Sequence, residues 1–161
     1  MPKWIDHIVV RVNDIKQSLE DYENKLSMKA SKGPDEIPDL GMTRAIVPLG
    51  DQGRFIELAE PLGEGGAIGN ALERYGEGVH LVALAVDDLA AATDEMKANG
   101  ARVIESGAQV FIHPRDGHGV MYQLIERNSH PLLEKQEKYH AAKGQNRDNH
   151  WWCIGYGSFH R

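Results

Sequence analysis

The sequence predicts an α+β fold in which two β-α-β-β-β modules form a curved mixed sheet around a cleft, followed by a C-terminal helix and an aromatic tail. Two internal repeats predict this fold. Residues 5–15 match residues 79–89 in their apolar positions and in a closing Asn/Asp-Asp-Ile/Leu tripeptide. Residues 55–60 match residues 121–126, and both segments end in glutamate. Two pairs of matching strands in a chain of 161 residues indicate a duplicated unit.

The first module is expected over residues 3–62, and a glycine-rich linker with a short helix over residues 63–77. Asp14 is a suitable N-cap because its side chain can accept a hydrogen bond from a free backbone amide of the first helical turn. The expected elements, in order, are a strand from residue 5, a helix from Asp14 to Lys25, strands at 27–31, 43–49 and 55–60, and the linker helix at 67–75.

The second module is expected over residues 78–127, and a C-terminal extension over residues 128–161. Asp88 is the N-cap expected for the second module's helix. The elements expected in that module are strands at 79–86, 102–105, 109–113 and 121–126, with a helix from Asp88 to Asn99. The extension is expected to form a polar helix and then an aromatic tail that packs on the body or on a partner subunit.

Composition excludes several classes of protein. The chain carries 18 Lys plus Arg against 24 Asp plus Glu, a formal charge of -6, so nucleic acid is not an expected partner. No apolar run is long enough to cross a bilayer, and the N-terminus lacks the pattern of a secretory leader. The single cysteine, Cys153, cannot form an internal disulfide and fits a reducing compartment. These features predict a cytoplasmic protein with no membrane partner.

Strand alternation sorts the polar residues by face, because successive side chains point to opposite sides of a sheet. His7 and Arg11 lie opposite an apolar set that should pack under the helix. The four equivalent positions expected to face the cleft are His7, Glu57, Leu81 and Gln123. The candidate substrate contacts are Phe55, Leu81, Ala83, Met121 and Gln123, and Ala85 adds to the apolar lining of the cleft.

A histidine and a carboxylate in one cleft suit two kinds of chemistry. They can ligate a divalent ion, or they can transfer protons without a metal. In the second case Glu57 would be the base and His7 its partner or an acid, while Arg11 would stabilise an oxyanion. An unpaired carboxylate buried between two apolar neighbours would cost several kcal/mol, so Glu57 is expected either at an exposed edge or paired in a cavity.

The duplicated unit with His7 in its opening strand resembles the vicinal oxygen chelate superfamily, which includes glyoxalase I, extradiol dioxygenases and methylmalonyl-CoA epimerase. The resemblance covers about three quarters of the chain. The stretches most similar to the epimerase branch are residues 5–10, 57–63, 76–88, 113–116 and 119–121. The resemblance implies metal positions at His7, Glu57, Leu81 and Gln123, and it implies a homodimer.

The chain departs from the family pattern at two of these positions. Members with a working metal site usually have a histidine where Leu81 stands and a glutamate where Gln123 stands. Leucine cannot ligate, so a divalent metal would keep only His7, Glu57 and the neutral amide of Gln123. Alternation places the neighbouring His80 on the core side unless a bulge rotates it into the cleft, and residues 86–88 fit the family pattern without one. We therefore expect a metal site that is partly lost.

The leading hypothesis for function is an isomerase, epimerase or lyase of the vicinal oxygen chelate type that moves a proton next to a carbonyl, with Glu57 as base. One alternative is a non-catalytic protein that binds a small molecule, because one half of the expected cleft is apolar. Another is a metal-dependent enzyme similar to glyoxalases or dioxygenases. The expected ligand is a small molecule: a carbonyl or acyl compound for the enzyme, and an apolar or aromatic compound for the binding protein.

Overall fold

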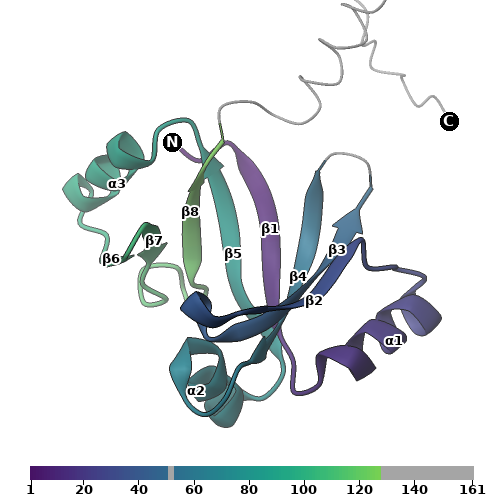
Figure 1. Ribbon diagram of the computed structural model, residues 1–161. Helices are drawn as coiled ribbons and strands as arrows, with labels where there is room; N and C mark the ends of the chain where they lie inside the picture. Colours follow the sequence, from purple (N-terminus) through teal and green to yellow (C-terminus); the bar gives the residue numbers. More distant parts are fainter. Residues whose placement is uncertain (51–52, 128–161) are drawn as a thin grey trace, which may run out of the picture. The chain divides into compact units, whose positions relative to one another are not determined.

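An eight-stranded mixed sheet organises the residues that this computed structural model describes, 1–50 and 53–127 (Figure 1). Its strand order is β2-β3-β4-β1-β5-β8-β7-β6. The predicted C-terminal helix and aromatic tail lie outside the described residues. In the described ranges, no helix is both long and apolar enough to span a bilayer.

The first module contributes one half of the sheet and one helix. Its elements are β1 (Trp4–Arg11), α1 (Ile15–Leu26), β2 (Lys32–Ile37), a 3-10 turn (Pro38–Leu40), β3 (Met42–Leu49) and β4 (Arg54–Pro61). β1 pairs in parallel with β4, and β3 pairs antiparallel with both β2 and β4. Asp14 caps α1, as predicted, because its side chain accepts a hydrogen bond from the Gln17 amide.

The second module repeats this arrangement. After the linker helix α2 (Gly66–Tyr75), its elements are β5 (Gly78–Val86), α3 (Leu89–Ala98), β6 (Val103–Ser106), β7 (Gln109–Ile112) and β8 (Tyr122–Glu126). β5 pairs in parallel with β8, as β1 does with β4, and Asp88 caps α3 by accepting from the Ala91 amide. The two opening strands, β1 and β5, join the halves in antiparallel pairing. The predicted α+β fold of two β-α-β-β-β units is confirmed.

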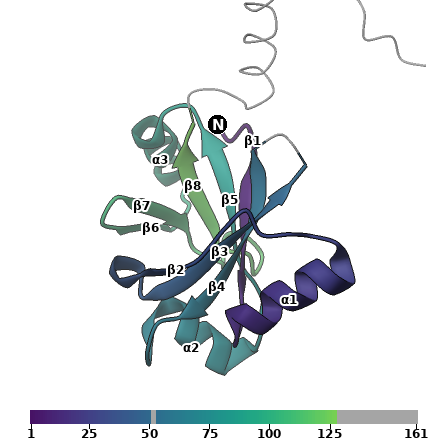
Figure 2. The same ribbon diagram turned by 45° about the vertical axis from the view of Figure 1, so that its right-hand side comes forward.

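The core is divided among three apolar clusters, and Figure 2 shows the helices α1, α2 and α3 placed around the curved sheet. One cluster packs α1 against β3 and β4 around Leu58, and a second packs α3 against β7 and β8 around Leu124. The third lies on the opposite side of the sheet from α1 and α3 and includes Val9 and Leu81, together with Ile68 of α2. Because α1 and α3 cover the outer side, the inner side of the sheet is left to form a site.

The prediction of a strand at residues 27–31 was wrong. Ser27 ends α1 in the left-handed conformation, with φ of 57°, and the strand begins only at Lys32. β2 is an exposed edge strand with little β-forming sequence, so alternation could not reveal it. Gly33 is required at this edge, since a Cβ there would lie 2.5 Å from the Arg44 carbonyl oxygen.

Two bulges interrupt the pairing of β1 with β5. Ile5 pairs with Leu84 and His7 with Ala83, so Asp6 is an extra residue on β1. Val9 pairs with Leu81 and Val10 with Val79, so His80 is an extra residue on β5. A bulge changes the face to which neighbouring side chains point. Both bulges therefore affect which residues reach the inner side of the sheet.

Candidate active site

A cavity of about 640 Å³ lies on the inner side of the sheet and is lined by residues of both modules. This volume is typical of a site for a small molecule. The four equivalent strand positions all lie on its wall: His7, Glu57, Leu81 and Gln123. Phe55 and Met121 line it as well, whereas Arg11 and Ala83 do not. The structure therefore brings together most of the predicted site residues.

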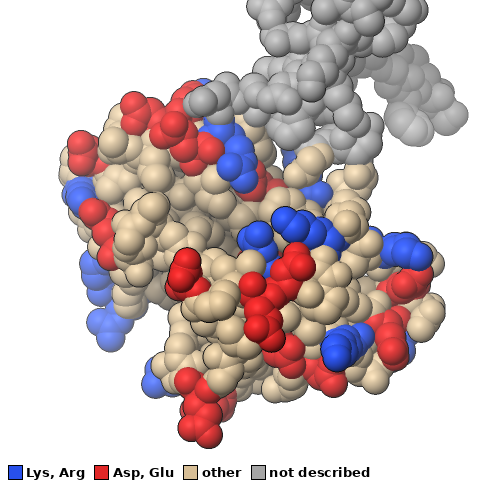
Figure 3. All heavy atoms as spheres, in the orientation of Figure 1, with Lys and Arg blue, Asp and Glu red and all other residues tan. Residues whose placement is uncertain are grey.

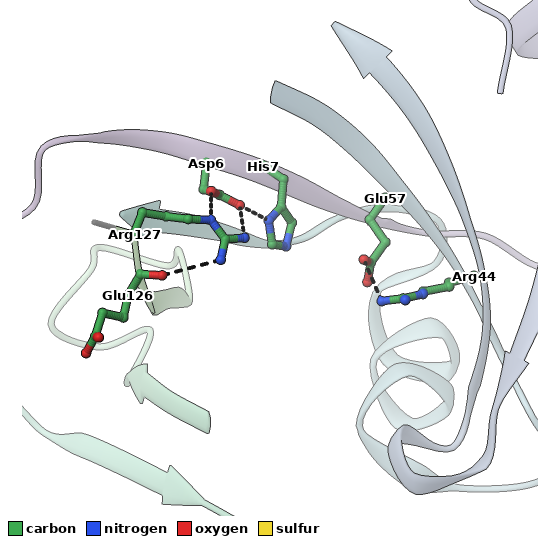
Figure 4. A network of polar contacts seen from close by, with 6 residues as sticks. All are labelled: Asp6, His7, Arg44, Glu57, Glu126 and Arg127. Carbon is green, nitrogen blue, oxygen red and sulfur yellow. Dashed lines mark hydrogen bonds and ion pairs between the residues drawn. The ribbon is translucent and has the colours of Figure 1, made fainter. Parts of the chain in front are cut away.

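His7 is held by a buried polar network at one end of the cavity (Figure 4). Its Nδ1 lies 2.8 Å from Asp6 Oδ1, and its ring stacks on Phe55 with ring centroids 4.6 Å apart. Arg127, which follows β8, donates from Nε to Asp6 Oδ2 at 2.8 Å. Burial raises the pKa of Asp6, but the hydrogen bonds from His7 and Arg127 outweigh it and leave the pKa below its usual value. Asp6 is therefore an ionised carboxylate that orients His7.

Glu57 is also buried, but within residues 1–50 and 53–127 it has no comparable hydrogen-bond partners. It forms an ion pair with Arg44 of β3, whose Nη1 lies 3.7 Å from Glu57 Oε2. That separation is an ion pair and is too long for a hydrogen bond. Burial raises the pKa of Glu57, although the charges of His7 and Arg44 act in the opposite direction. Figure 4 shows Glu57 and Arg44 pointing toward one another, apart from the network around His7.

The prediction that His80 lies on the core side was wrong. The bulge in β5 places both His80 and Leu81 on the cavity wall. Burial lowers the pKa of His80, and the nearby Arg11 charge lowers it further. His80 is therefore a neutral imidazole on this wall, next to the leucine that occupies the expected ligand position.

Arg11 is not placed to act on a ligand in the cavity. Its Nε donates to the Gly76 carbonyl at 2.7 Å, its Nη1 donates to the Val79 carbonyl, and its guanidinium lies over the Tyr75 ring. These contacts tie β1 to the end of α2 and to the start of β5. The predicted role of Arg11 in binding an oxyanion is not supported by this position.

The residues present do not fit the donor set of a resident divalent ion. Zinc and related ions are usually held by three or more nitrogen, oxygen or sulfur donors in a compact group. Across residues 1–50 and 53–127, no group of three His, Cys, Asp or Glu side chains is arranged to hold one. Of the predicted ligands, Gln123 supplies only a neutral amide and Leu81 supplies no donor. No step proposed below involves a metal.

Three residues of the site were missed by reasoning from sequence. Asp6 could not be found by alternation because it lies in a bulge, and Arg127 follows the last strand. Arg44 could have been found by alternation, because it lies two residues after Met42 on β3 and so shares a face of the sheet with it. In the structure both side chains line the cavity. The face of the molecule drawn in Figure 3 carries both acidic and basic side chains, with basic atoms near its centre.

Paired β-α-β-β-β modules whose inner strands present a histidine and a carboxylate to one cavity define a protein of the vicinal oxygen chelate type. Residues 6–122 match the family described as the glyoxalase/bleomycin resistance protein/dioxygenase superfamily. The chain belongs to this superfamily.

Similar proteins of known activity include epimerases and lyases. The ethylmalonyl-CoA/methylmalonyl-CoA epimerase of Cereibacter sphaeroides is 34% identical over 130 residues, which cover 74% of this chain and 95% of that protein. The lactoylglutathione lyase of Salmonella typhimurium is 31% identical over 129 residues, covering 74% and 90%. A variant of the Streptomyces coelicolor methylmalonyl-CoA epimerase, in complex with 2-nitronate-propionyl-CoA, superposes with a TM-score of 0.71 at 26% identity, covering 80% of this chain and all of that one.

Proposed function

We propose that the protein is an enzyme that moves a proton at a carbon next to a carbonyl group, with Glu57 as the base. One observation carries this proposal: a buried carboxylate with a raised pKa lines the cavity, and within residues 1–50 and 53–127 its closest cationic contact is an ion pair at 3.7 Å, too long for a hydrogen bond. A general base works best when its pKa is close to the operating pH, and burial shifts Glu57 in that direction.

His7 is the second group in the proposed reaction. The Asp6 carboxylate engages Nδ1, which leaves Nε2 as the ring nitrogen available to a ligand. Stacking on Phe55 restricts the ring further. His7 can therefore exchange a hydrogen bond or a proton with the substrate from a fixed position, while Asp6 acts as a positioning residue.

The relatives support an isomerase, epimerase or lyase, since they are named as methylmalonyl-CoA epimerases and lactoylglutathione lyases. A solved relative holds an acyl-CoA analogue, so a carbonyl or acyl compound is the proposed class of substrate. A homodimer in the cytoplasm is proposed as the working form.

Deuterium exchange tests the proposed base. Methylmalonyl-CoA and a panel of 2-oxo acids would be incubated with the protein in deuterated water, and incorporation at the carbon next to the carbonyl followed by NMR. Glu57→Gln is expected to slow the exchange by a factor of about 10² to 10⁴, the usual contribution of a general base. Glu60→Gln is the matched control, because Glu60 lies on the same strand and outside the cavity lining. Full exchange by Glu57→Gln would show that the base is another group.

A non-catalytic binding protein is the second candidate, and the apolar part of the cavity favours it. Leu81, Phe111 and Met121 give the wall contributed by the second module a large apolar area. Such a wall can retain an apolar ligand without any reaction. Native mass spectrometry of the purified protein distinguishes the two, because a retained ligand together with no exchange on any probe would favour binding.

A further inference from the structure

We propose that Arg44 is the carboxylate-binding residue of the cavity, and that the substrate is an enolisable carboxylic acid with an apolar body. This inference rests on the proposed function, which it deepens by naming a class of substrate. The Arg44 side chain has hydrogen-bond donors that the described part of the chain leaves without a partner.

The Arg44 guanidinium has five N–H donors, yet among the described residues its side-chain contact is the 3.7 Å ion pair with Glu57. Its Nε is buried and has no hydrogen-bond partner in the same part of the chain. Leaving a buried donor unsatisfied destabilises the folded protein, so such groups usually have a partner. A ligand carboxylate is the partner that fits best, because two parallel N–H···O bonds match the planar fork of an arginine.

The other arginine on the cavity wall, Arg127, already donates hydrogen bonds within the protein. Arg127 donates from Nε and Nη2 to Asp6, and from Nη1 to the carbonyl of Glu126. Among the described residues that line the cavity, Arg44 is thus the arginine whose donors remain available. An anionic group entering the cavity would be drawn to Arg44.

The position of Arg44 beside Glu57 links recognition to the proposed chemistry. The Arg44 charge now lowers the pKa of Glu57 and so weakens it as a base. A ligand carboxylate that pairs with Arg44 offsets that charge, and its own negative charge lies near Glu57 as well. Both effects increase the proton affinity of Glu57 when the substrate binds. Recognition of the carboxylate would therefore prepare the base for its reaction.

The surroundings of Arg44 define the rest of the ligand. Met42, Leu40 and Ile68 line the cavity near it in the first module and the linker helix, and Phe111 and Ile104 line it in the second module. A charged head against Arg44 and an apolar body against these side chains would bury most of a small ligand. Branched or aromatic 2-oxo acids have this chemistry, and their C3 hydrogens are acidic because they adjoin a carbonyl.

A matched pair of probes tests the inference: 4-methyl-2-oxopentanoate, and 4-methyl-2-oxopentanamide, in which an uncharged amide replaces the carboxylate. Dissociation constants would be measured by ligand-observed NMR or calorimetry. The unmodified protein is expected to bind the carboxylate about tenfold or more tightly than the amide, the effect of a charge-assisted hydrogen bond. Arg44→Met should abolish this preference with little change for the amide, and Arg44→Lys should retain part of it.

Arg74→Met is the control, because it removes one positive charge from the exposed end of α2 outside the cavity and should leave both constants unchanged. Thermal melting would establish that each variant is folded. Equal affinities for the two probes, no saturable binding of the carboxylate at millimolar concentration, or an equal loss of both in Arg44→Met would each overturn the inference.

The proposed function fails in a different way. Glu57→Gln should keep the preference for the carboxylate while it loses deuterium exchange at C3. If the unmodified protein shows the preference but catalyses no exchange on any probe, Arg44 is still the carboxylate-binding residue and the proton-transfer proposal is wrong. If the unmodified protein catalyses deuterium exchange but binds the carboxylate and the amide equally well, the proton-transfer proposal stands and Arg44 is not the carboxylate-binding residue.

Discussion

Two buried carboxylates of the first module differ in what surrounds them. Asp6 on β1 is engaged by His7 Nδ1 and by two nitrogens of Arg127, and its pKa is lowered. Glu57 on the neighbouring strand β4 forms, among the described residues, a 3.7 Å ion pair with Arg44, and its pKa is raised. Both side chains are more than nine-tenths buried. Hydrogen bonding, and not the degree of burial, decides which carboxylate stays ionised and which is able to take a proton.

The difference separates a structural carboxylate from a reactive one. Asp6 joins β1 to the residue that follows β8, so it links the first strand of one module to the end of the other. In the described part of the chain Glu57 has no contact of comparable geometry, and it lines the cavity. Substitutions at the two positions should therefore change the free energy of unfolding in opposite directions.

The largest effect on stability is expected from Asp6→Asn. It leaves the Arg127 guanidinium without its anionic partner and weakens the support of His7, which should lower the free energy of unfolding by about 2 to 3 kcal/mol. This loss of stability is smaller than for a fully buried ion pair, because the Arg127 side chain is half-exposed. Asp87→Asn breaks only the exposed pair with Lys3 and should change stability by less than about 1 kcal/mol in the same urea titrations.

The loss of stability caused by Asp6→Asn should depend on pH. Because its folded-state pKa lies below the unfolded value of 3.8, its stabilisation is present above that value and disappears as the pH falls through the folded pKa. Unfolding of the original protein and of Asp6→Asn, compared at neutral pH and in acid, should converge in acid. A constant difference at every pH would assign the effect to packing instead.

A smaller effect of opposite sign is expected from Glu57→Gln. An ionised, poorly bonded carboxylate destabilises the fold, so the substitution should raise the free energy of unfolding at neutral pH by about 1 kcal/mol. The folded pKa is above the unfolded value of 4.5, so this destabilisation is absent below 4.5 and develops as the pH rises through the folded pKa. The measurement is thermal or urea unfolding across this range. A destabilised variant at neutral pH would mean that Glu57 is structural like Asp6.

The smallest expected effect is a change in the pKa of Glu57, caused by Arg44→Met in the protein without ligand. Removing this charge removes one cause that lowers the pKa of Glu57, so the pKa should rise further. The titration of the Glu57 carboxyl carbon, followed by carbon-13 NMR, measures it. Arg74→Met gives the matching loss of charge at a distant site. A titration that moves equally in both variants would indicate a change in net charge and no direct interaction.

The repeat and the strand alternation predicted the fold and a large part of the cavity wall. His7, Glu57 and Gln123 were found because each lies in a strand that alternates regularly near it. The cap residues Asp14 and Asp88 were predictable as well, since capping depends on local sequence.

The remaining features depend on pairing between distant strands, which local sequence does not encode. The bulges at Asp6 and His80 arise where β1 and β5 meet, so alternation along one strand alone placed His80 on the wrong side. β2 lies at an exposed edge where packing imposes no pattern. The position of Arg11 depends on its contacts with Gly76 and Val79, far along the chain.

The bulge in β5 also bears on how such a site can change during evolution. Two consecutive side chains, His80 and Leu81, cover one stretch of wall opposite Val9. The parallel pairing with β8 begins only at Val82, so a substitution at either position leaves that pairing intact. The bulge gives β5 one additional position on the cavity wall. A side chain that donates to a metal or ligand can therefore be gained or lost at either position without disturbing the pairing with β8.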